Sequence, residues 1–101
     1  MTGGTVDKDD VTLSQLGLRA PGGRDPRITG LSIDSRTVKP GHLFAALPGS
    51  AVHGGEFIQY ALRMQAAAVL TDRQGAEIAA DVLSGWDGAL IVAEDPRAAL
   101  A

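Results

Sequence analysis

The chain has 101 residues, of which 45% are hydrophobic and only 4% aromatic, and its formal net charge is −3. This length fits one small domain with an aliphatic core, while the absence of cysteine excludes a disulfide framework and thiolate metal sites. The scattered basic residues give no reason to expect nucleic-acid binding, and without an apolar run of roughly 18 residues or a secretory signal we expect a cytoplasmic protein with no membrane partner.

The first quarter of the chain is predicted to hold little regular structure. Residues 1–10 are polar and are expected to be a disordered N-terminal segment. Residues 11–18 are predicted to form a short helix, with Thr12 or Ser14 near its start. Residues 19–27 contain two prolines and two glycines, which favours a loop.

Two predicted strands follow, separated by a turn. Residues 28–34 form the first, and because side chains alternate along a strand, Ile33 and Ser35 should point to the same side. Lys39-Pro40-Gly41 predicts a turn. Residues 43–47 are continuously apolar, which predicts a strand that is buried on both faces.

The second half of the chain alternates predicted helices and strands. Residues 48–55 form a loop with three glycines, and the helical spacing of Phe57, Ala61 and Met64 then predicts a helix. The remaining predicted elements are a strand over residues 67–70, a helix over 76–83, a turn over 85–88 and a strand over 89–92.

This order of elements predicts an α/β domain with a small mixed, mainly parallel sheet and flanking helices. The sheet is expected to be mixed because only a short turn separates residues 28–34 from residues 43–47, so these two strands could pair antiparallel.

The end of the chain predicts the start of another helix, with Asp95 as the N-cap and Pro96 at the first helical position. A helix of about one turn is unstable in isolation. We therefore expect the natural protein to continue and the chain to be its N-terminal domain.

The tripeptide Asp34-Ser35-Arg36 permits two interpretations. It is either a simple turn with a weak surface ion pair, or a corner that binds a ligand. A uracil ring offers two carbonyl acceptors and one N–H donor; the Ser35 hydroxyl can both donate and accept, while Ile33 could pack against the ring.

The glycine-rich loop from Gly49 to Gly55 is also ambiguous. Its backbone amides could bind phosphate, yet it matches neither the P-loop nor the dinucleotide-binding pattern, so it could equally be an ordinary connection. Neither His42 nor His53 has a set of partners that indicates a metal site, and no nucleophile–base pair stands out. No catalytic or metal-binding residue is predicted.

Together, four segments resemble the N-terminal domain of the Mur ligase family. The segments are residues 33–36, 38–41 and 43–49, and Phe57-Ile58 with Ala61. The resemblance extends over about residues 28 to 101. It is closest to the member that adds the third amino acid, usually meso-diaminopimelate, to UDP-N-acetylmuramoyl-L-alanyl-D-glutamate, and next closest to the member that adds D-alanyl-D-alanine.

The resemblance implies that residues 11–101 bind the uridine-diphosphate part of this substrate within an ATP-dependent peptidoglycan-precursor ligase. ATP and Mg²⁺ would bind the central domain, which this chain lacks together with the C-terminal domain, so the chain alone is not expected to be catalytic. The alternative, from another class, is a non-catalytic α/β interaction or regulatory domain.

The resemblance also implies site residues. Ile33 and Ser35 match positions that contact the uridine, and Ser50, Ala51 and Val52 match the stretch that lies along the nucleotide sugar. One departure concerns the loop's own hydrogen bonds, because this chain has His53-Gly54-Gly55 where the family usually has Asp-Gly and a polar residue.

Overall fold

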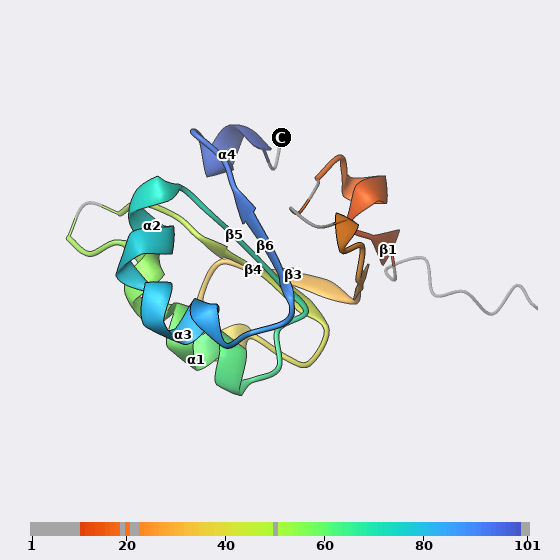
Figure 1. The fold of residues 1–101 in the computed structure, drawn as a ribbon, viewed down its shortest axis with the longest axis horizontal. Coiled ribbons are helices and arrows are strands. Elements are labelled where there is room, and N and C mark those ends of the chain that lie inside the picture. Colours follow the sequence, from red (N-terminus) through yellow and green to blue (C-terminus); the bar gives the residue numbers. More distant parts are fainter. Residues whose placement is uncertain (1–10, 19, 21–22, 50, 100–101) are drawn as a thin grey trace, which may run out of the picture.

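The computed structural model describes residues 11–18, 20, 23–49 and 51–99. Its centre is a four-stranded parallel sheet in the order β3-β4-β5-β6 (Figure 1). The strands are β3 (Gly30–Ser32), β4 (His42–Ala46), β5 (Ala68–Thr71) and β6 (Ala89–Val92). The α/β class predicted from the sequence is confirmed.

The helical elements alternate with these strands. They are the 3₁₀ turns η3 (Ser35–Thr37) and η4 (Gly54–Phe57) and the helices α1 (Ile58–Arg63), α2 (Arg73–Ile78), α3 (Ala80–Ser84) and α4 (Pro96–Ala99). The predicted helix start at Pro96 is confirmed, and the Asp95 carboxylate accepts a hydrogen bond from the Ala98 amide at 3.3 Å. No described helix is long and apolar enough to cross a membrane.

The pairing of β3 with β4 is parallel, so the antiparallel alternative is wrong. The chain reverses twice between the two strands, first at η3 and again at Pro40-Gly41, and it therefore enters β4 in its original direction. Gly41 has a φ of +89°, which favours glycine, and its carbonyl accepts a hydrogen bond from the Thr29 amide at 3.0 Å.

The N-terminal part differs from its prediction in two respects. The predicted strand over residues 28–34 is divided, because β2 (Arg27–Ile28) pairs antiparallel with β1 (Val11–Thr12) before β3 enters the main sheet. The predicted helix over residues 11–18 is replaced by β1 and the 3₁₀ turn η1 (Ser14–Leu16).

A tertiary contact explains why no α-helix forms there. The amide and the hydroxyl of Ser14 both donate to the Asp25 carboxylate at 2.7 Å, which ties the short turn to the following loop. Leu13 and Leu18 on either side of the turn are buried in the core. Burial of these side chains and the Asp25 contact therefore outweigh local helix propensity.

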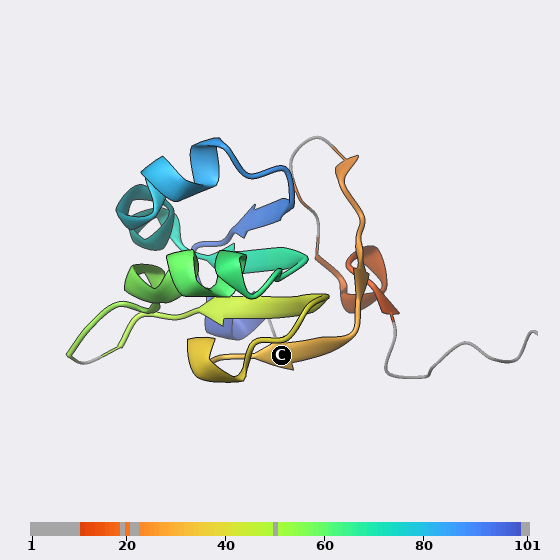
Figure 2. The same cartoon turned by 90° about the horizontal axis from the view of Figure 1, so that it is seen from below.

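The core lies on both faces of the sheet. On one face the N-terminal segment packs against alternate strand residues, and on the other α1, α2 and α3 do so (Figures 1 and 2). Leu43 faces the first cluster and Phe44 the second, which confirms that β4 is buried on both faces. The first cluster is Leu13, Leu18, Ala20, Ile28, Leu43, Ala68, Leu70, Ala89 and Ile91; the second is Val38, Phe44, Ala46, Ile58, Ala61, Ala66, Val69 and Ala79.

The later elements follow the predictions with one exception. The strand over residues 89–92 is confirmed, and the predicted strand over 67–70 is observed one residue later. The predicted helix over 76–83 begins earlier and is divided at Ala79, where φ is −101°. It begins earlier because the Asp72 carboxylate caps it, accepting from the Gly75 amide at 2.8 Å.

Candidate functional site

The carboxyl edge of the parallel sheet carries the candidate site. Because all four strands run in the same direction, the segments that follow them meet at this edge, where α/β folds commonly bind ligands. The segment after β3 contains Asp34-Ser35-Arg36, and the segment after β4 is the glycine-rich loop. The sequence-predicted site residues therefore belong to two neighbouring segments.

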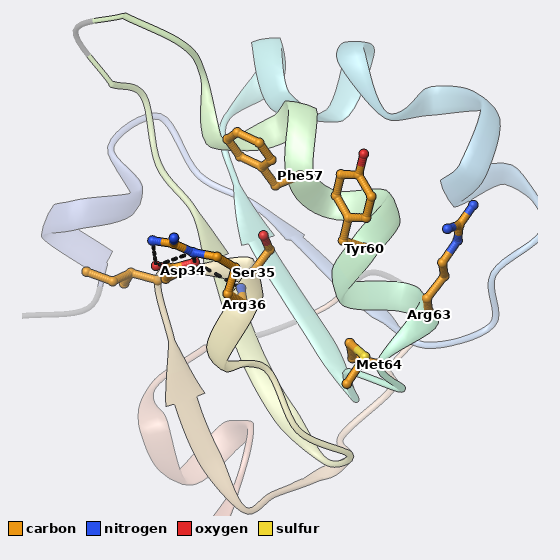
Figure 3. A pocket seen from close by; sticks show the side chains of 8 residues that line it. Asp34, Ser35, Arg36, Phe57, Tyr60, Arg63 and Met64 are labelled. Atoms are coloured by element: carbon orange, nitrogen blue, oxygen red, sulfur yellow. Dashed lines mark hydrogen bonds and ion pairs between the residues drawn. The ribbon is translucent and has the colours of Figure 1, made fainter.

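A hollow of about 980 Å³ lies between η3 and α1 (Figure 3). This volume is in the range of small-molecule sites. The residues that line it are Ile33, Asp34, Ser35, Arg36, Phe57, Tyr60, Arg63 and Met64. Two of the predicted site residues, Ile33 and Ser35, thus lie in one cavity.

Ile33 and Ser35 present free groups to this hollow. The Ile33 side chain is 67% exposed, which is unusual for isoleucine and leaves an apolar surface for a ligand. The Ser35 hydroxyl points toward the side of Phe57 and Tyr60 (Figure 3), and no partner for it is found among the described residues. It can therefore donate and accept hydrogen bonds from a bound molecule.

Asp34 holds the turn that positions Ser35. Its carboxylate accepts from the Arg36 amide at 2.9 Å and forms an ion pair with the Arg36 guanidinium at 2.7 Å. The hydrogen bonds from the Arg36 side chain and amide lower the pKa of Asp34 to about 2. The Thr37 amide and hydroxyl donate to the Asp34 carbonyl, so the whole turn is closed by its own groups.

The other wall of the hollow comes from α1 and was missed by the sequence analysis. Phe57 and Met64 were interpreted only as helix-forming apolar residues, yet both are exposed and line the hollow, together with Tyr60 and Arg63. The core contacts of this helix come from Ile58 and Ala61. The spacing of Phe57, Tyr60 and Met64 at positions i, i+3 and i+7 was the available signal for a second apolar face.

The glycine-rich loop has a closed base but does not line the hollow. The Gly54 amide donates to the Leu47 carbonyl at 2.8 Å, and the Arg97 guanidinium donates to the Pro48 carbonyl at 2.9 Å. Ala51 and Val52 are exposed near its tip and are absent from the lining of the hollow. Ser50 lies outside the described residues.

His53 performs the capping role at the end of this loop. Its Nδ1 accepts a hydrogen bond from the Gly55 amide at 2.7 Å, while its Nε2 lies 2.8 Å from the Asp72 carboxylate. Because Nδ1 is an acceptor, the proton of the neutral ring is on Nε2, which donates to Asp72. The residue that departs from the usual family pattern therefore satisfies the loop's own hydrogen bonds.

Asp72 joins this cap to the start of α2. One oxygen of its carboxylate accepts from both His53 Nε2 and the Gly75 amide. Burial acts to raise the pKa of Asp72, but the hydrogen bonds from Gly75 and His53 outweigh it, so the pKa is lowered. The polar groups of His53 and Asp72 are thus occupied by structural hydrogen bonds that hold η4 against α2.

The other histidine is also engaged in structure. The Nδ1 atom of His42 lies 2.8 Å from the Ser32 hydroxyl, which is buried beside the Thr37 carbonyl. In the part of the chain that the structure describes, no three side chains of the His, Asp and Glu type gather as metal ligands do.

The comparisons with known proteins agree with the resemblance seen in the sequence. The model of the "Mur ligase family, catalytic domain" matches residues 27–101. The UDP-N-acetylmuramoyl-L-alanyl-D-glutamate--2,6-diaminopimelate ligase of Streptomyces coelicolor is 51% identical over 84 residues, which are 83% of this chain and 16% of that protein. The ligase of the same name from Pseudomonas putida is 47% identical over 67% of this chain and 14% of its own length.

Solved structures show the same fold. MurF from Acinetobacter baumannii superposes with a TM-score of 0.69 at 21% identity, over 89% of this chain and 19% of that one. A second structure, the UDP-N-acetylmuramoylalanyl-D-glutamyl-2,6-diaminopimelate--D-alanyl-D-alanyl ligase from the same species, gives a TM-score of 0.70 at 22% identity, over 94% of this chain and 21% of that one. The chain spans about a sixth of the length of its curated relatives. On the match over residues 27–101, the chain belongs to the Mur ligase family.

Proposed function

We propose that the chain is the N-terminal domain of a peptidoglycan-precursor amide ligase and binds the uridine-diphosphate part of UDP-N-acetylmuramoyl-L-alanyl-D-glutamate. In the full protein this substrate would receive meso-diaminopimelate in an ATP-dependent reaction. The observation that carries the proposal is the free Ser35 hydroxyl beside the exposed Ile33 at the carboxyl edge of the sheet. The names of the curated relatives support this choice of substrate over that of the D-alanyl-D-alanine-adding ligase.

The chemistry of the two residues suits a uracil ring. Its two carbonyl groups and one N–H can each be matched by a hydroxyl group, and its flat face can lie against the Ile33 side chain. We assign the nucleotide sugar to the backbone of Ala51 and Val52, with Ser50 next to them. The exposure of Ala51 and Val52 and the hydrogen bonds that close the base of this loop support the assignment.

ATP and Mg²⁺ do not fit the residues of this chain. The phosphate-binding pattern G-x-x-x-x-G-K-[ST] occurs nowhere in the sequence. Although the matching family model is described as a catalytic domain, we assign ATP, Mg²⁺ and the bond-forming step to the central and C-terminal domains of the full protein. The chain's own part is to hold the substrate by its nucleotide, and this remote binding orients the reacting carboxylate.

The nucleotide site can be tested by NMR on the protein labelled with ¹⁵N. Addition of UMP or UDP should shift the amide signals of residues 33–36 and 49–54. Saturating nucleotide that moves neither segment would contradict the site. A cytoplasmic location, which remains a prediction, can be tested separately by cell fractionation.

In the full-length ligase, Ser35→Ala should raise KM for the UDP substrate about three- to tenfold, which corresponds to one neutral hydrogen bond. The kcat value should change little, because the contact is present in both the ground state and the transition state. A loss confined to kcat would refute the role of Ser35.

A further inference from the structure

The α1 wall of the hollow has no assigned role, although it holds two of the chain's few aromatic residues. Tyr60 is 46% exposed and Phe57 lies one turn before it, while the buried side of the helix is supplied by Ile58 and Ala61. Core packing therefore does not account for either ring. Exposed apolar groups that gather beside a cavity indicate a binding surface.

The two rings form one wall rather than a clamp. Their centroids are 6.5 Å apart and their planes are inclined by 33°. A flat ring inserted between two parallel rings would need a gap of about 7 Å, two contact distances of 3.5 Å. The separation of Phe57 and Tyr60 is too small and too tilted for that, so a ligand ring would have to lie on the side of the pair that faces the hollow.

Arg63 leaves one face of Tyr60 available. The Arg63 guanidinium carbon lies over the Tyr60 ring at 5.9 Å from its centroid, a cation–π contact that covers one face. In Figure 3, Tyr60 lies between Arg63 and Ser35. In that view Arg63 lies on the other side of Tyr60 from Ser35, so its guanidinium does not stand between the Tyr60 ring and the free Ser35 hydroxyl.

The charges around the hollow also favour an anionic ligand. Two guanidinium groups, Arg36 and Arg63, and one carboxylate, Asp34, line it, and Asp34 is paired with Arg36. One positive charge, that of Arg63, therefore has no carboxylate partner among the described residues. An aromatic ring joined to an anion meets all of these conditions.

We infer that Tyr60 stacks against the base of the bound uridine nucleotide, that Phe57 extends this wall, and that Arg63 is a positioning residue that supports Tyr60 from behind. The inference rests on the proposed function and adds residues to the same site. Stacking of a base on an aromatic side chain tightens binding by about five- to 150-fold. The stack is therefore expected to hold the base more strongly than the single Ser35 hydrogen bond.

The experiment compares three probes on the full natural protein: uridine, UMP and ribose 5-phosphate. Tyr60→Leu keeps an apolar side chain without a ring. It should weaken the binding of uridine and UMP about tenfold and leave the binding of ribose 5-phosphate unchanged. The dissociation constants of Tyr60→Phe for uridine and UMP should stay within twofold of those of the unsubstituted protein. Arg63→Met removes both the support behind the ring and a positive charge, so it should weaken the binding of uridine by a small factor and that of UMP by a somewhat larger one, with Arg24→Met as the matched control.

Each other outcome contradicts a defined part of the proposal. If UMP does not bind the unsubstituted protein, the proposed function fails and the stacking role fails with it. If UMP binds and Ser35→Ala weakens it while Tyr60→Leu does not, only the stacking role is overturned. A loss on Arg63→Met that is confined to UMP and ribose 5-phosphate would make Arg63 a phosphate ligand and overturn its positioning role.

A second measurement needs no substitution. It uses the 101-residue chain, whose one tyrosine makes the ring proton signals those of Tyr60 without ambiguity. Nuclear Overhauser effects between these protons and H5 or H6 of bound uridine are expected, and their absence under saturating uridine would overturn the stacking role.

Discussion

Two pairs of side chains at the carboxyl edge have nearly the same contact distance but differ greatly in their exposure to solvent. The His53–Asp72 contact is 2.8 Å long, and its side chains are 6% and 19% exposed. The Arg36–Asp34 ion pair is 2.7 Å long, and its side chains are 87% and 40% exposed. Water competes for the second pair and hardly reaches the first, so equal distances do not imply equal contributions to stability.

The comparison separates structure from recognition at this edge. The buried pair joins the end of the loop, η4 and α2, and every polar atom named in it has a partner. The exposed pair shapes only its own turn and leaves the neighbouring Ser35 hydroxyl without a partner among the described residues. The first pair is therefore expected to affect folding and the second to affect ligand binding.

The largest effect is expected from crowding the buried pair. A Cβ at Gly75 would overlap the Thr71 hydroxyl and lie 2.8 Å from Cε1 of His53. Gly75→Ala should therefore lower the free energy of unfolding by about 3 kcal/mol, measured in urea. Gly85→Ala is the matched control, because nothing lies within 4 Å of its Cβ, and it should be neutral or slightly stabilising. Equal effects of the two substitutions would contradict the tight packing at Gly75.

Removal of the histidine should have the next largest effect. His53→Ala deletes the cap on Gly55 and one hydrogen bond to Asp72, and roughly 2 kcal/mol of unfolding free energy should be lost. His53→Asn keeps a capping oxygen and should recover part of this loss. If the asparagine variant is as unstable as the alanine variant, the cap has no part in the effect.

Acid should distinguish the two pairs through their carboxylates. The pKa of Asp72 is lowered in the folded protein, so its contribution is complete above the ordinary value of 3.8 and is lost as the pH falls through the lower, folded pKa. Asp34 follows the same sign with its pKa near 2, but its exposed pair is screened by salt. The measurement is the pH dependence of the unfolding free energy in urea between pH 5 and pH 2, in 1 M salt. Asp34→Asn should leave this pH dependence unchanged, whereas Asp72→Asn should still reduce it.

The smallest effect is expected from the exposed pair itself. Arg36→Gln removes the ion pair but keeps the backbone amide that Asp34 caps, so the unfolding free energy should change very little. Thermal unfolding would show this as a shift of a few degrees at most. A destabilisation as large as that of His53→Ala would remove the distinction between the two pairs.

The local sequence pattern was sufficient to predict those elements for which burial, propensity and capping all indicate the same structure. Residues 43–47 were predicted as a strand buried on both faces, and β4 is buried on both faces because the N-terminal segment covers one face of the sheet and the helices cover the other. The strand at residues 89–92 and the capped helix start at Pro96 were also predicted correctly. In each case burial, propensity and capping favour the same structure.

A long-range contact and a local turn explain the strand predictions that failed. Residues 28–34 read as one strand, but pairing with Val11 draws Ile28 into a separate antiparallel pair. The Pro40-Gly41 turn suggested a hairpin, yet η3 adds a second reversal and makes the pairing parallel. The first contact leaves no mark in the periodicity of the sequence because it joins residues that are distant along the chain, whereas η3 is a local turn closed by hydrogen bonds to Asp34.

For the candidate site, the sequence by itself indicated the family and led us to propose Ile33 and Ser35, which the structure places after β3 at the carboxyl edge of the sheet. Only the tertiary structure decided which side chains share their cavity. Packing of Ile58 and Ala61 against the sheet leaves Phe57, Tyr60 and Arg63 along the hollow that Ser35 also lines. The rotation of a helix on a sheet is set by which of its faces buries more apolar surface, and here both faces are apolar, so the sequence pattern could not choose between them.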